Sequence, residues 1–386
     1  MIMYGNDSHS GCSATMSALE DFKTGLETLK KAERYRSLNL ADGLDLTSND
    51  YLGMAQEPFL RKCAIQALEN GLDIGAAGSR LLRGHTKSHA NLEEFAANHF
   101  NAPKTLYFSS GFQANYAILM TLPSRHDVIL YDSLIHASMR DGIQASKAKG
   151  FKFAHNDLNQ LEDRLKKHSN SKQLCWICVE SLYSMDGDFA PLDNIVELAK
   201  DYNFVLIVDE AHSTGIYGPH GKGLSQKLIE KLGHERIITV HTCGKAIGVA
   251  GGLICASDFM IQTLINKARP FIYSTAPMPL QAYLVQKSLG FLSGNEGDIR
   301  RTKLFELCER AKALFGEAGS QIVPIILGED AKTLEIAKKL REKGYDIRAI
   351  RPPTVPESSA RLRLSLSSYL LVEQLNSFAD DFKKLT

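Results

Sequence analysis

Short apolar runs alternate with longer amphipathic segments through the middle of the chain. The runs are four to six residues long and rich in β-branched residues, which is typical of strands buried on both faces of a parallel sheet. They are Thr105–Phe108, Val128–Tyr131, Leu174–Val179, Phe204–Val208, Ile237–Val240 and Gly252–Ala256. Helical spacing is found at Pro58–Leu68, His89–Phe100, Gly111–Leu122, Leu161–Lys167 and Leu192–Asp201. The alternation predicts an α/β fold with βα units and a mostly parallel central sheet.

The two ends of the chain follow other patterns. Ser17–Leu38 has helical spacing, and Asp45–Leu52 is expected to be a strand with a polar centre. The C-terminal elements are expected at Gly297–Ala318 (helix), Ile322–Leu327 (strand), Lys332–Lys343 (helix), Ile347–Ile350 and Arg361–Ser365 (strands), before a final amphipathic helix. We therefore predict an N-terminal helical arm over residues 1–47, a large α/β domain over 48–290 and a smaller α+β domain over 291–386.

Composition narrows the class of protein. With 386 residues, of which 44% are hydrophobic, the chain can bury a large core. Its net charge of +1 gives no overall field to attract nucleic acid or an anionic membrane. No apolar stretch is long enough to span a bilayer, and the polar start is unlike a secretory signal. Seven scattered cysteines fit reduced thiols, so we expect a cytoplasmic protein without nucleic-acid or membrane partners.

The pair Cys175 and Cys178 is the one cysteine spacing that invites a metal or disulfide interpretation. Both residues lie in a predicted strand, where residues three apart point to opposite faces. We therefore interpret both as small core residues and predict no metal site.

Two strand ends carry the residues with the clearest chemistry. Asp209 follows the run Phe204–Val208, and Lys245 comes shortly after Ile237–Val240. In open α/β sheets, ligands bind just past the carboxyl ends of the strands. A lysine that forms a Schiff base and an acid that pairs with a pyridinium nitrogen suit pyridoxal 5′-phosphate (PLP). The pattern predicts a PLP enzyme.

Other polar residues are expected at the same edge. The turn Ser109–Phe112 joins a strand to a helix, and such a turn binds phosphate through backbone N–H groups. Thr242 supplies a hydroxyl for the same phosphate, His136 is placed to stack on a flat ring, and His212 to bond a ring hydroxyl. Each alone is more often structural than catalytic, and only their convergence favours a cofactor site.

The chain resembles the α-oxoamine synthases, fold-type I PLP enzymes that condense an amino acid with an acyl-CoA. The matching motifs run nearly from end to end and are specific as an ordered set. They are Ser48-Asn49-Asp50-Tyr51-Leu52-Gly53, Gly78-Ser79-Arg80, Ser110-Gly111-Phe112, His136-Ala137-Ser138, Ser184-Met185-Asp186-Gly187-Asp188, Asp209-Glu210-Ala211-His212-Ser213-Thr214-Gly215 and Gly244-Lys245-Ala246. Three further stretches favour the branch that joins L-alanine to pimeloyl-CoA in biotin synthesis: Phe153–Asp157, Ile272–Thr275, and Ile350–Pro356 leading to Arg361-Leu362-Arg363.

This resemblance implies a role for each matched residue. The catalytic residues would be Lys245, Asp209, His136 and His212. The cofactor would be bound by Gly111, Phe112, His136, Ser184, Asp209, His212, Thr242, Lys245 and, from the neighbouring subunit of a homodimer, Ser274 and Thr275. The substrate would be bound by Arg36, Asn49, Thr354 and Arg363, with Arg363 gripping the amino-acid carboxylate through a bidentate fork.

The activity implied is a decarboxylative condensation of L-alanine with pimeloyl-CoA, or another pimeloyl thioester, that releases CoA and CO2. Three alternatives stay open: a family member using glycine or serine with another acyl-CoA, a fold-type I aminotransferase, and a non-catalytic binding subunit. The last is disfavoured because Lys245, Asp209, His136 and Arg363 are all present.

Overall fold

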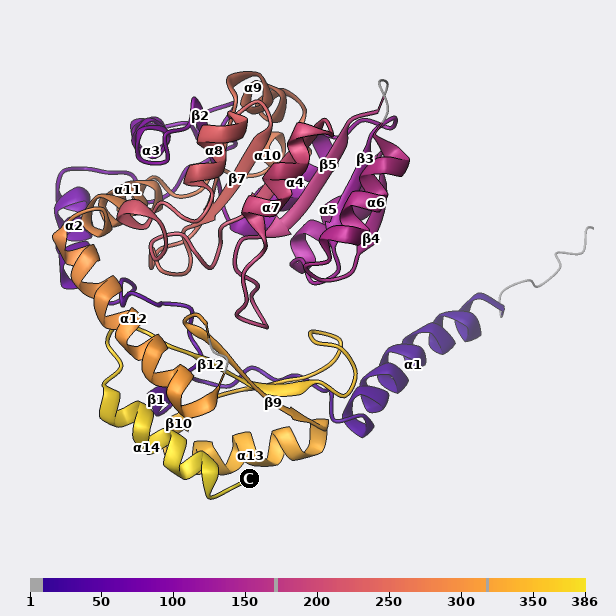
Figure 1. Cartoon of the computed structure of the whole chain (residues 1–386), viewed down its shortest axis with the longest axis vertical. Helices are drawn as coiled ribbons and strands as arrows, with labels where there is room; N and C mark the ends of the chain where they lie inside the picture. The colour runs from indigo at the N-terminus through magenta and orange to yellow at the C-terminus, as the bar shows by residue number, and fades with distance from the viewer. Residues whose placement is uncertain (1–9, 170–172, 317–318) are drawn as a thin grey trace, which may run out of the picture. The chain divides into compact units, whose positions relative to one another are not determined.

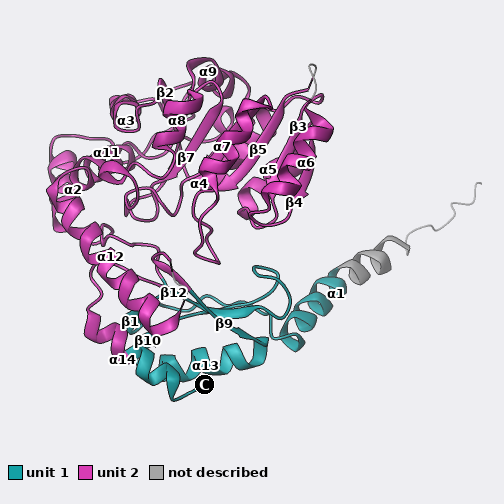
Figure 2. Ribbon diagram, in the orientation of Figure 1, with its two compact units in different colours: residues 1–47, 324–364, 378–386 teal, residues 48–323, 365–377 magenta. Residues whose placement is uncertain are grey.

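A computed structural model describes residues 10–169, 173–316 and 319–386, with side chains described from residue 19 onward (Figure 1). Residues 1–9 of the predicted arm lie outside this range. The chain divides into two compact units (Figure 2). Unit 1 comprises residues 1–47, 324–364 and 378–386, and unit 2 comprises residues 48–323 and 365–377. The domain boundaries at 47/48 and 290/291 stay a prediction.

Unit 2 is built on a seven-stranded sheet with the order β2-β8-β7-β6-β5-β3-β4. Its strands are β2 (Lys104–Phe108), β3 (Val128–Asp132), β4 (Lys149–Phe153), β5 (Cys175–Glu180), β6 (Phe204–Asp209), β7 (Ile237–Thr242) and β8 (Gly252–Ala256). The strands from β7 to β4 pair in parallel, whereas β8 is antiparallel to both of its neighbours. The prediction of a mostly parallel sheet is confirmed, and the six predicted strands begin and end within two residues of the expected positions.

Strand β4 was not predicted. Its sequence, Lys149-Gly150-Phe151-Lys152-Phe153, mixes lysine with phenylalanine, and the strand lies at the sheet edge, where it pairs with β3. Lysines on an exposed edge strand also discourage pairing with another sheet. A pattern search for apolar runs therefore passes over this strand.

Helices cover both faces of the sheet (Figure 1). One hydrophobic cluster joins the sheet to α4 (Gly111–Thr121), α5 (Ala137–Ala145), α9 (Asp258–Lys267) and α10 (Arg269–Ile272). The other joins it to α6 (Leu158–His168), α7 (Leu192–Glu197) and α8 (Gln226–Leu232). Successive residues of a strand alternate between the clusters, as the pleat requires.

Cys175 and Cys178 belong to opposite clusters, and both thiols are free and buried. Burial raises the pKa of the Cys175 thiol to about 11 and that of Cys178 further. The interpretation of both as core residues is confirmed.

The remaining helices of unit 2 are α2 (Pro58–Glu69), α3 (Lys87–His99), α11 (Pro279–Leu292) and α12 (Asn295–Phe315), with short 3-10 turns at Leu198–Lys200 and Pro219–Gly221. The helices α5, α8, α9 and α11 were not predicted. Helix α11 is apolar on several sides, so it lacks a clear amphipathic stripe.

Unit 1 combines α1 (Ser10–Lys31) and α13 (Asp330–Glu342) with short strands and the end of α14 (Val372–Lys383). Strand β1 (Leu44–Asp45) pairs in parallel with β10 (Tyr345–Asp346). A second sheet has the order β11-β12-β9, formed by β11 (Ala349–Ile350), β12 (Ala360–Ser365) and β9 (Ile322–Gly328).

Two local predictions were wrong. The first helix ends at Lys31 rather than Leu38, since Arg34 leaves the helix and pairs with Asp330 and Glu357. The predicted strand Asp45–Leu52 is only two residues long. Beyond it the chain turns, because the Asp50 carboxylate accepts hydrogen bonds from the backbone of residues 54 and 55.

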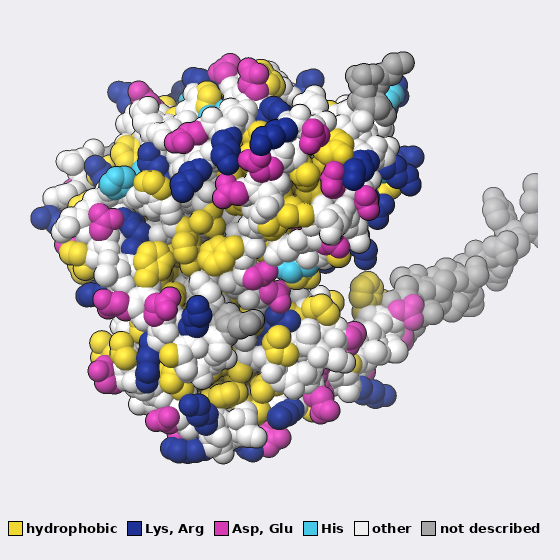
Figure 3. All heavy atoms as spheres, in the orientation of Figure 1, with side chains coloured by type: hydrophobic (Ala, Val, Ile, Leu, Met, Phe, Trp, Pro, Cys, Tyr) yellow, Lys and Arg dark blue, Asp and Glu magenta, His cyan; other side chains and the backbone are white. Residues whose placement is uncertain are grey.

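The described surface carries both signs of charge. Lysine and arginine side chains are interspersed with acidic ones on the face drawn in Figure 3. Across the described ranges, no helix has the length and apolarity needed to cross a membrane.

Candidate active site

The strands that precede Asp209 and Lys245 are neighbours. β6 and β7 pair in parallel, and Asp209 is aligned with Val240. Asp209 is the last residue of β6, and β7 ends at Thr242, three residues before Lys245. Both side chains therefore start from the same carboxyl edge of the sheet, where ligands of such sheets bind.

A chain of hydrogen bonds runs from Lys245 into the core. The Nζ of Lys245 lies 2.6 Å from Nε2 of His212, and Nδ1 of His212 lies 2.7 Å from the hydroxyl of Tyr51. Tyr51 donates to Oδ1 of Asn49 at 2.8 Å. Because that hydroxyl has one proton, Nδ1 of His212 must donate to Tyr51, which leaves Nε2 to accept from Lys245.

Asp209 is fixed as a hydrogen-bond acceptor on both oxygens. Oδ1 accepts from the backbone N–H of Ala211 at 2.9 Å, and Oδ2 accepts from the amide of Asn115 at 2.6 Å. Asp209 is 4% exposed, so these bonds replace water around the carboxylate.

The same network reaches His136. The Asn115 amide also donates to Oγ of Ser138 at 3.1 Å, and that hydroxyl lies 2.8 Å from Nδ1 of His136. Burial lowers the pKa of His136, Asp209 raises it and Lys245 lowers it again. A lowered pKa favours a neutral imidazole, which is suited to stacking on an aromatic ring.

The N-terminus of α4 is the candidate phosphate-binding site, and it packs closely against neighbouring residues. Ser110 caps this helix by accepting the N–H of Gln113, and the first N–H groups of a helix have no partner within it. A Cβ on Gly111 would come within 3.1 Å of Oγ1 of Thr242, and one on Gly252 would come within 2.8 Å of the Gly111 backbone. The two glycines let the helix start approach Thr242 closely.

Ser184 is nine-tenths buried and lies on the loop after β5. Its backbone N–H donates to Oε2 of Glu180, the last residue of β5, at 3.1 Å. His155 holds the same loop, because its ring lies 3.0 Å from Oδ1 of Asp132 and 2.7 Å from Oδ2 of Asp188. Ser184 therefore sits on an anchored loop.

Ser274 and Thr275 follow α10 and lie near the start of α4 in the same chain. Thr275 forms a β-bridge with Ser79, and Ser274 and Thr275 line a small cavity together with Ser109 and Gln113. Their predicted contact with a neighbouring subunit's phosphate stays a prediction.

The substrate-binding candidates are divided between the units. Asn49 belongs to unit 2, whereas Arg36, Thr354 and Arg363 belong to unit 1. Within unit 1, Nη2 of Arg36 donates to Oγ1 of Thr354 at 3.0 Å, so two of the predicted residues are brought together. Arg363 lies on β12 and is 7% exposed.

The sequence analysis assigned no role to three polar residues that lie at the site. Tyr51 lies in a matched motif, but its contact with His212 spans 161 residues. Asn115 lies one helical turn after Gly111, and its contact with Asp209 spans 94 residues. Glu180 carried the same signal as Asp209, a carboxylate ending a buried strand, and this signal could have identified it.

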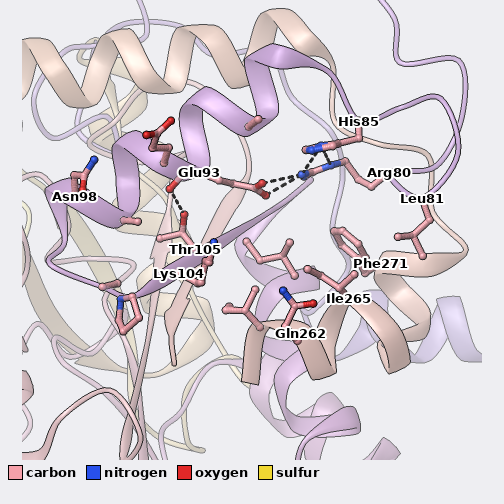
Figure 4. A pocket seen from close by; sticks show the side chains of 17 residues that line it. Arg80, Leu81, His85, Glu93, Asn98, Lys104, Thr105, Gln262, Ile265 and Phe271 are labelled. Carbon is pink, nitrogen blue, oxygen red and sulfur yellow. Dashed lines mark hydrogen bonds and ion pairs between the residues drawn. The ribbon is translucent and has the colours of Figure 1, made fainter. Parts of the chain in front are cut away.

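A cavity of about 570 Å³ elsewhere in unit 2 contains none of the predicted site residues. It is lined from α3, β2 and α9 (Figure 4). Its polar groups bond one another: Arg80 pairs with Glu93 at 2.9 Å and donates to His85. The predicted site residues at the carboxyl edge of the sheet take no part in this cavity.

Comparison with known proteins identifies the family of the chain. The sequence profile described as "Aminotransferase class I and II" matches residues 41–381. The chain is 40% identical to an 8-amino-7-oxononanoate synthase of Herminiimonas arsenicoxydans, over 84% of this chain and 85% of that protein. The solved structure of an 8-amino-7-oxononanoate synthase from Francisella tularensis is 31% identical with a TM-score of 0.74, covering 89% of this chain and 97% of the other.

The fold is also that of a serine palmitoyltransferase from S. paucimobilis with bound PLP, at a TM-score of 0.85 and 24% identity, over 96% of this chain and 98% of the other. These matches confirm the predicted fold-type I architecture and the resemblance drawn from the motifs. The chain belongs to the aminotransferase class I and II family and, within it, to the 8-amino-7-oxononanoate synthases.

Proposed function

We propose that the chain catalyses the PLP-dependent condensation of L-alanine with pimeloyl-CoA to give 8-amino-7-oxononanoate, CoA and CO2 in biotin synthesis. A bond forms between the alanine Cα and the acyl carbonyl carbon, the C–S bond of the thioester breaks, and the alanine carboxylate leaves as CO2. The observation that carries the proposal is the Lys245–His212 pair beside Asp209 in a chain of this family.

The described residues fit the cofactor. An amine, a buried carboxylate, a neutral imidazole and the N-terminus of α4 match its aldehyde, ring nitrogen, ring face and phosphate. When bound, PLP supplies an electron sink for the electron pair left on the substrate carbon. Lys245 and Asp209 would hold the group at its two ends, and His136 would cover the ring.

Lys245 is the residue we assign to move the substrate's α-proton. Its Nζ bonds Nε2 of His212, an acceptor whose direction is set by Tyr51. The bond holds Nζ in one orientation and gives its proton a place to go. A general acid–base group positioned in this way contributes typically about 10²–10⁴-fold to the rate.

Asp209 would pair with the ring nitrogen of the bound cofactor and hold its proton, which supports the ring as an electron sink. The bonds from Ala211 and Asn115 hold the Asp209 carboxylate in place. His212 and Ser184 are assigned to the ring hydroxyl, and Gly111, Phe112 and Thr242 to the phosphate.

Substrate recognition is assigned by family resemblance to Arg363 for the amino-acid carboxylate, and to Asn49, Thr354 and Arg36. The Arg36–Thr354 hydrogen bond in unit 1 supports a joint role for that pair. The Arg363 guanidinium suits a carboxylate because it can donate two parallel bonds.

The active unit is proposed to be a cytoplasmic homodimer, with Ser274 and Thr275 completing the neighbouring subunit's phosphate site. Large exposed hydrophobic side chains beside the Ser79–Thr275 bridge support this assembly: Leu81, Leu82 and Tyr273.

A CoA-release assay tests the function. L-alanine, glycine and L-serine are each paired with pimeloyl-, acetyl-, succinyl- and palmitoyl-CoA, and CO2 release and product mass are recorded. The expected result is the highest kcat/KM for alanine with pimeloyl-CoA. Preference for another pair would indicate a different α-oxoamine synthase, and amino transfer to a 2-oxo acid without CoA release would indicate an aminotransferase.

A further inference from the structure

Glu180 is a buried carboxyl group at the centre of the candidate site that the proposed chemistry does not use. It ends β5, as Asp209 ends β6, and the two residues are direct partners in the parallel register. Paired residues on neighbouring strands place their side chains on the same face of the sheet. Glu180 is 2% exposed and Asp209 is 4% exposed, so two acidic groups share a site with little access to water.

The hydrogen bonds of the two carboxyl groups differ. Each oxygen of Asp209 accepts a hydrogen bond, from Ala211 and from Asn115, whereas the N–H of Ser184 donates to Oε2 of Glu180. Oε1 of Glu180 is buried without a partner among the described residues. Hydrogen-bond donors stabilise the ionised form of a carboxyl group, whereas burial without donors stabilises the neutral form. Of these two carboxyl groups, Asp209 is therefore the one that carries the negative charge.

Glu210 is a second buried glutamate of this chain, and its hydrogen bonding differs from that of Glu180. Its two oxygens accept from the backbone N–H groups of residues 224 and 225 and from the hydroxyls of Ser181, Ser213 and Ser225. Glu210 is as deeply buried as Glu180, yet it is surrounded by donors. Glu180 lacks such a shell.

We propose that Glu180 is held as an uncharged carboxylic acid, which leaves Asp209 as the only negative charge of the pair while Oε2 of Glu180 fixes the loop that carries Ser184. Glu180 is thus a positioning residue. Two adjacent carboxyl groups whose environments separate their protonation states are a recurring device of acid–base sites.

The charged groups around Glu180 agree with this assignment. Burial and, to a lesser extent, the charge of Asp209 raise the pKa of Glu180, whereas Lys245 and the backbone N–H groups of Ser184 and His136 lower it, and the net pKa is about 8. Tyr183, from the same loop, also faces Glu180, and burial raises the pKa of its hydroxyl well above the usual value. Near pH 7 Glu180 is therefore mainly protonated.

Infrared difference spectroscopy of the holoenzyme tests the proposal directly. Wild type minus Glu180→Gln should show the C=O stretch of a protonated carboxylic acid at pH 7, disappearing with a midpoint near pH 8. Asp209→Asn removes the neighbouring charge and should lower this midpoint by about one pH unit, the size expected for strongly interacting sites. Absence of the band at pH 7, or a midpoint that Asp209→Asn leaves in place, overturns the proposal.

A second comparison tests the positioning role. Glu180→Ala leaves the Ser184 N–H without its acceptor, whereas Glu180→Gln keeps an acceptor, so PLP should dissociate more readily from the alanine variant than from the glutamine variant. Glu210→Gln is the matched control and should be the more destabilised of the two glutamine variants, because an amide replaces an acceptor of several donors. Equal PLP affinity of the alanine and glutamine variants contradicts the role. The role of Glu180 in catalysis rests on the proposed function. The infrared band does not depend on turnover, so absence of condensation activity would refute the proposed function and leave the protonation of Glu180 standing.

Discussion

Nζ of Lys245 lies 2.6 Å from Nε2 of His212, and the Tyr51 hydroxyl on the far side of that ring fixes its hydrogen-bonding direction. The pair joins residues 33 positions apart, one after β6 and one after β7. Adjacent parallel strands bring the two loops together, and the hydrogen bond to His212 holds the lysine amine at the sheet edge where ligands of such sheets bind.

Replacing Lys245 with alanine should abolish the covalent link to the cofactor while leaving the fold intact. The side chain lies in a loop at the sheet edge, so little packing is lost. CoA release should fall by at least about 10⁴-fold, the upper range for loss of an acid–base group. Visible absorbance reports the link, and circular dichroism reports the fold. Lys303→Ala, on the exposed side of α12, is the control and should retain both signals.

Tyr51→Phe should slow turnover without unfolding the chain. The change leaves Nδ1 of His212 without its acceptor, which costs about 1–3 kcal/mol in a buried site. We expect kcat to fall about 10-fold, equivalent to about 1.4 kcal/mol in the barrier, and the pH profile of kcat to change shape. Tyr107→Phe removes another buried hydroxyl, which donates to Ala250 O, and provides the matched control. If Tyr51→Phe keeps the wild-type pH profile, as the control Tyr107→Phe should, then the function of His212 does not depend on its hydrogen bond to Tyr51.

His155 should make stability depend on pH. Burial lowers its pKa, but hydrogen bonds and charges from Asp132 and Asp188 raise it to about 10, above the unfolded value near 6.5. A raised folded-state pKa stabilises the fold fully below about pH 6.5, less and less between there and pH 10, and not at all above. His155→Gln should therefore cost about 1–3 kcal/mol at pH 6.

Chemical denaturation at pH 6, 8 and 10.5 measures this effect. The difference between wild type and His155→Gln should shrink as pH rises. His126→Gln, an exposed histidine, is the control and should show no such trend. A difference that stays constant across the three pH values would show that His155 is not charged in the folded chain.

Local sequence patterns were sufficient for the sheet centre and for the strand ends that carry Asp209 and Lys245. Buried parallel strands are apolar along their whole length, so β6 and β7 stand out without any alignment. The edge strand β4 has no continuous apolar run, and helix α11 is apolar on several sides, so neither has a pattern that stands out in the sequence. The hydrogen-bond partners of the site residues could not be predicted from the sequence either. Asn115 contacts Asp209, and Tyr51 contacts His212, only because the fold brings distant parts of the chain together.

Gly252→Ala should weaken PLP binding from a position that need not touch the cofactor. The added Cβ would come within 2.8 Å of the Gly111 backbone and of Ser110 O, so the start of α4 must move away from β8. The backbone N–H groups at that helix start are the proposed phosphate donors, and their displacement should raise the PLP Kd about 10-fold, or about 1.4 kcal/mol. Equilibrium dialysis or absorbance titration measures this Kd. Gly75→Ala meets no atom within 4 Å and is the control. An unchanged Kd in a folded Gly252→Ala protein would place the phosphate elsewhere, since only a cradle formed by this helix start is sensitive to a methyl group behind it.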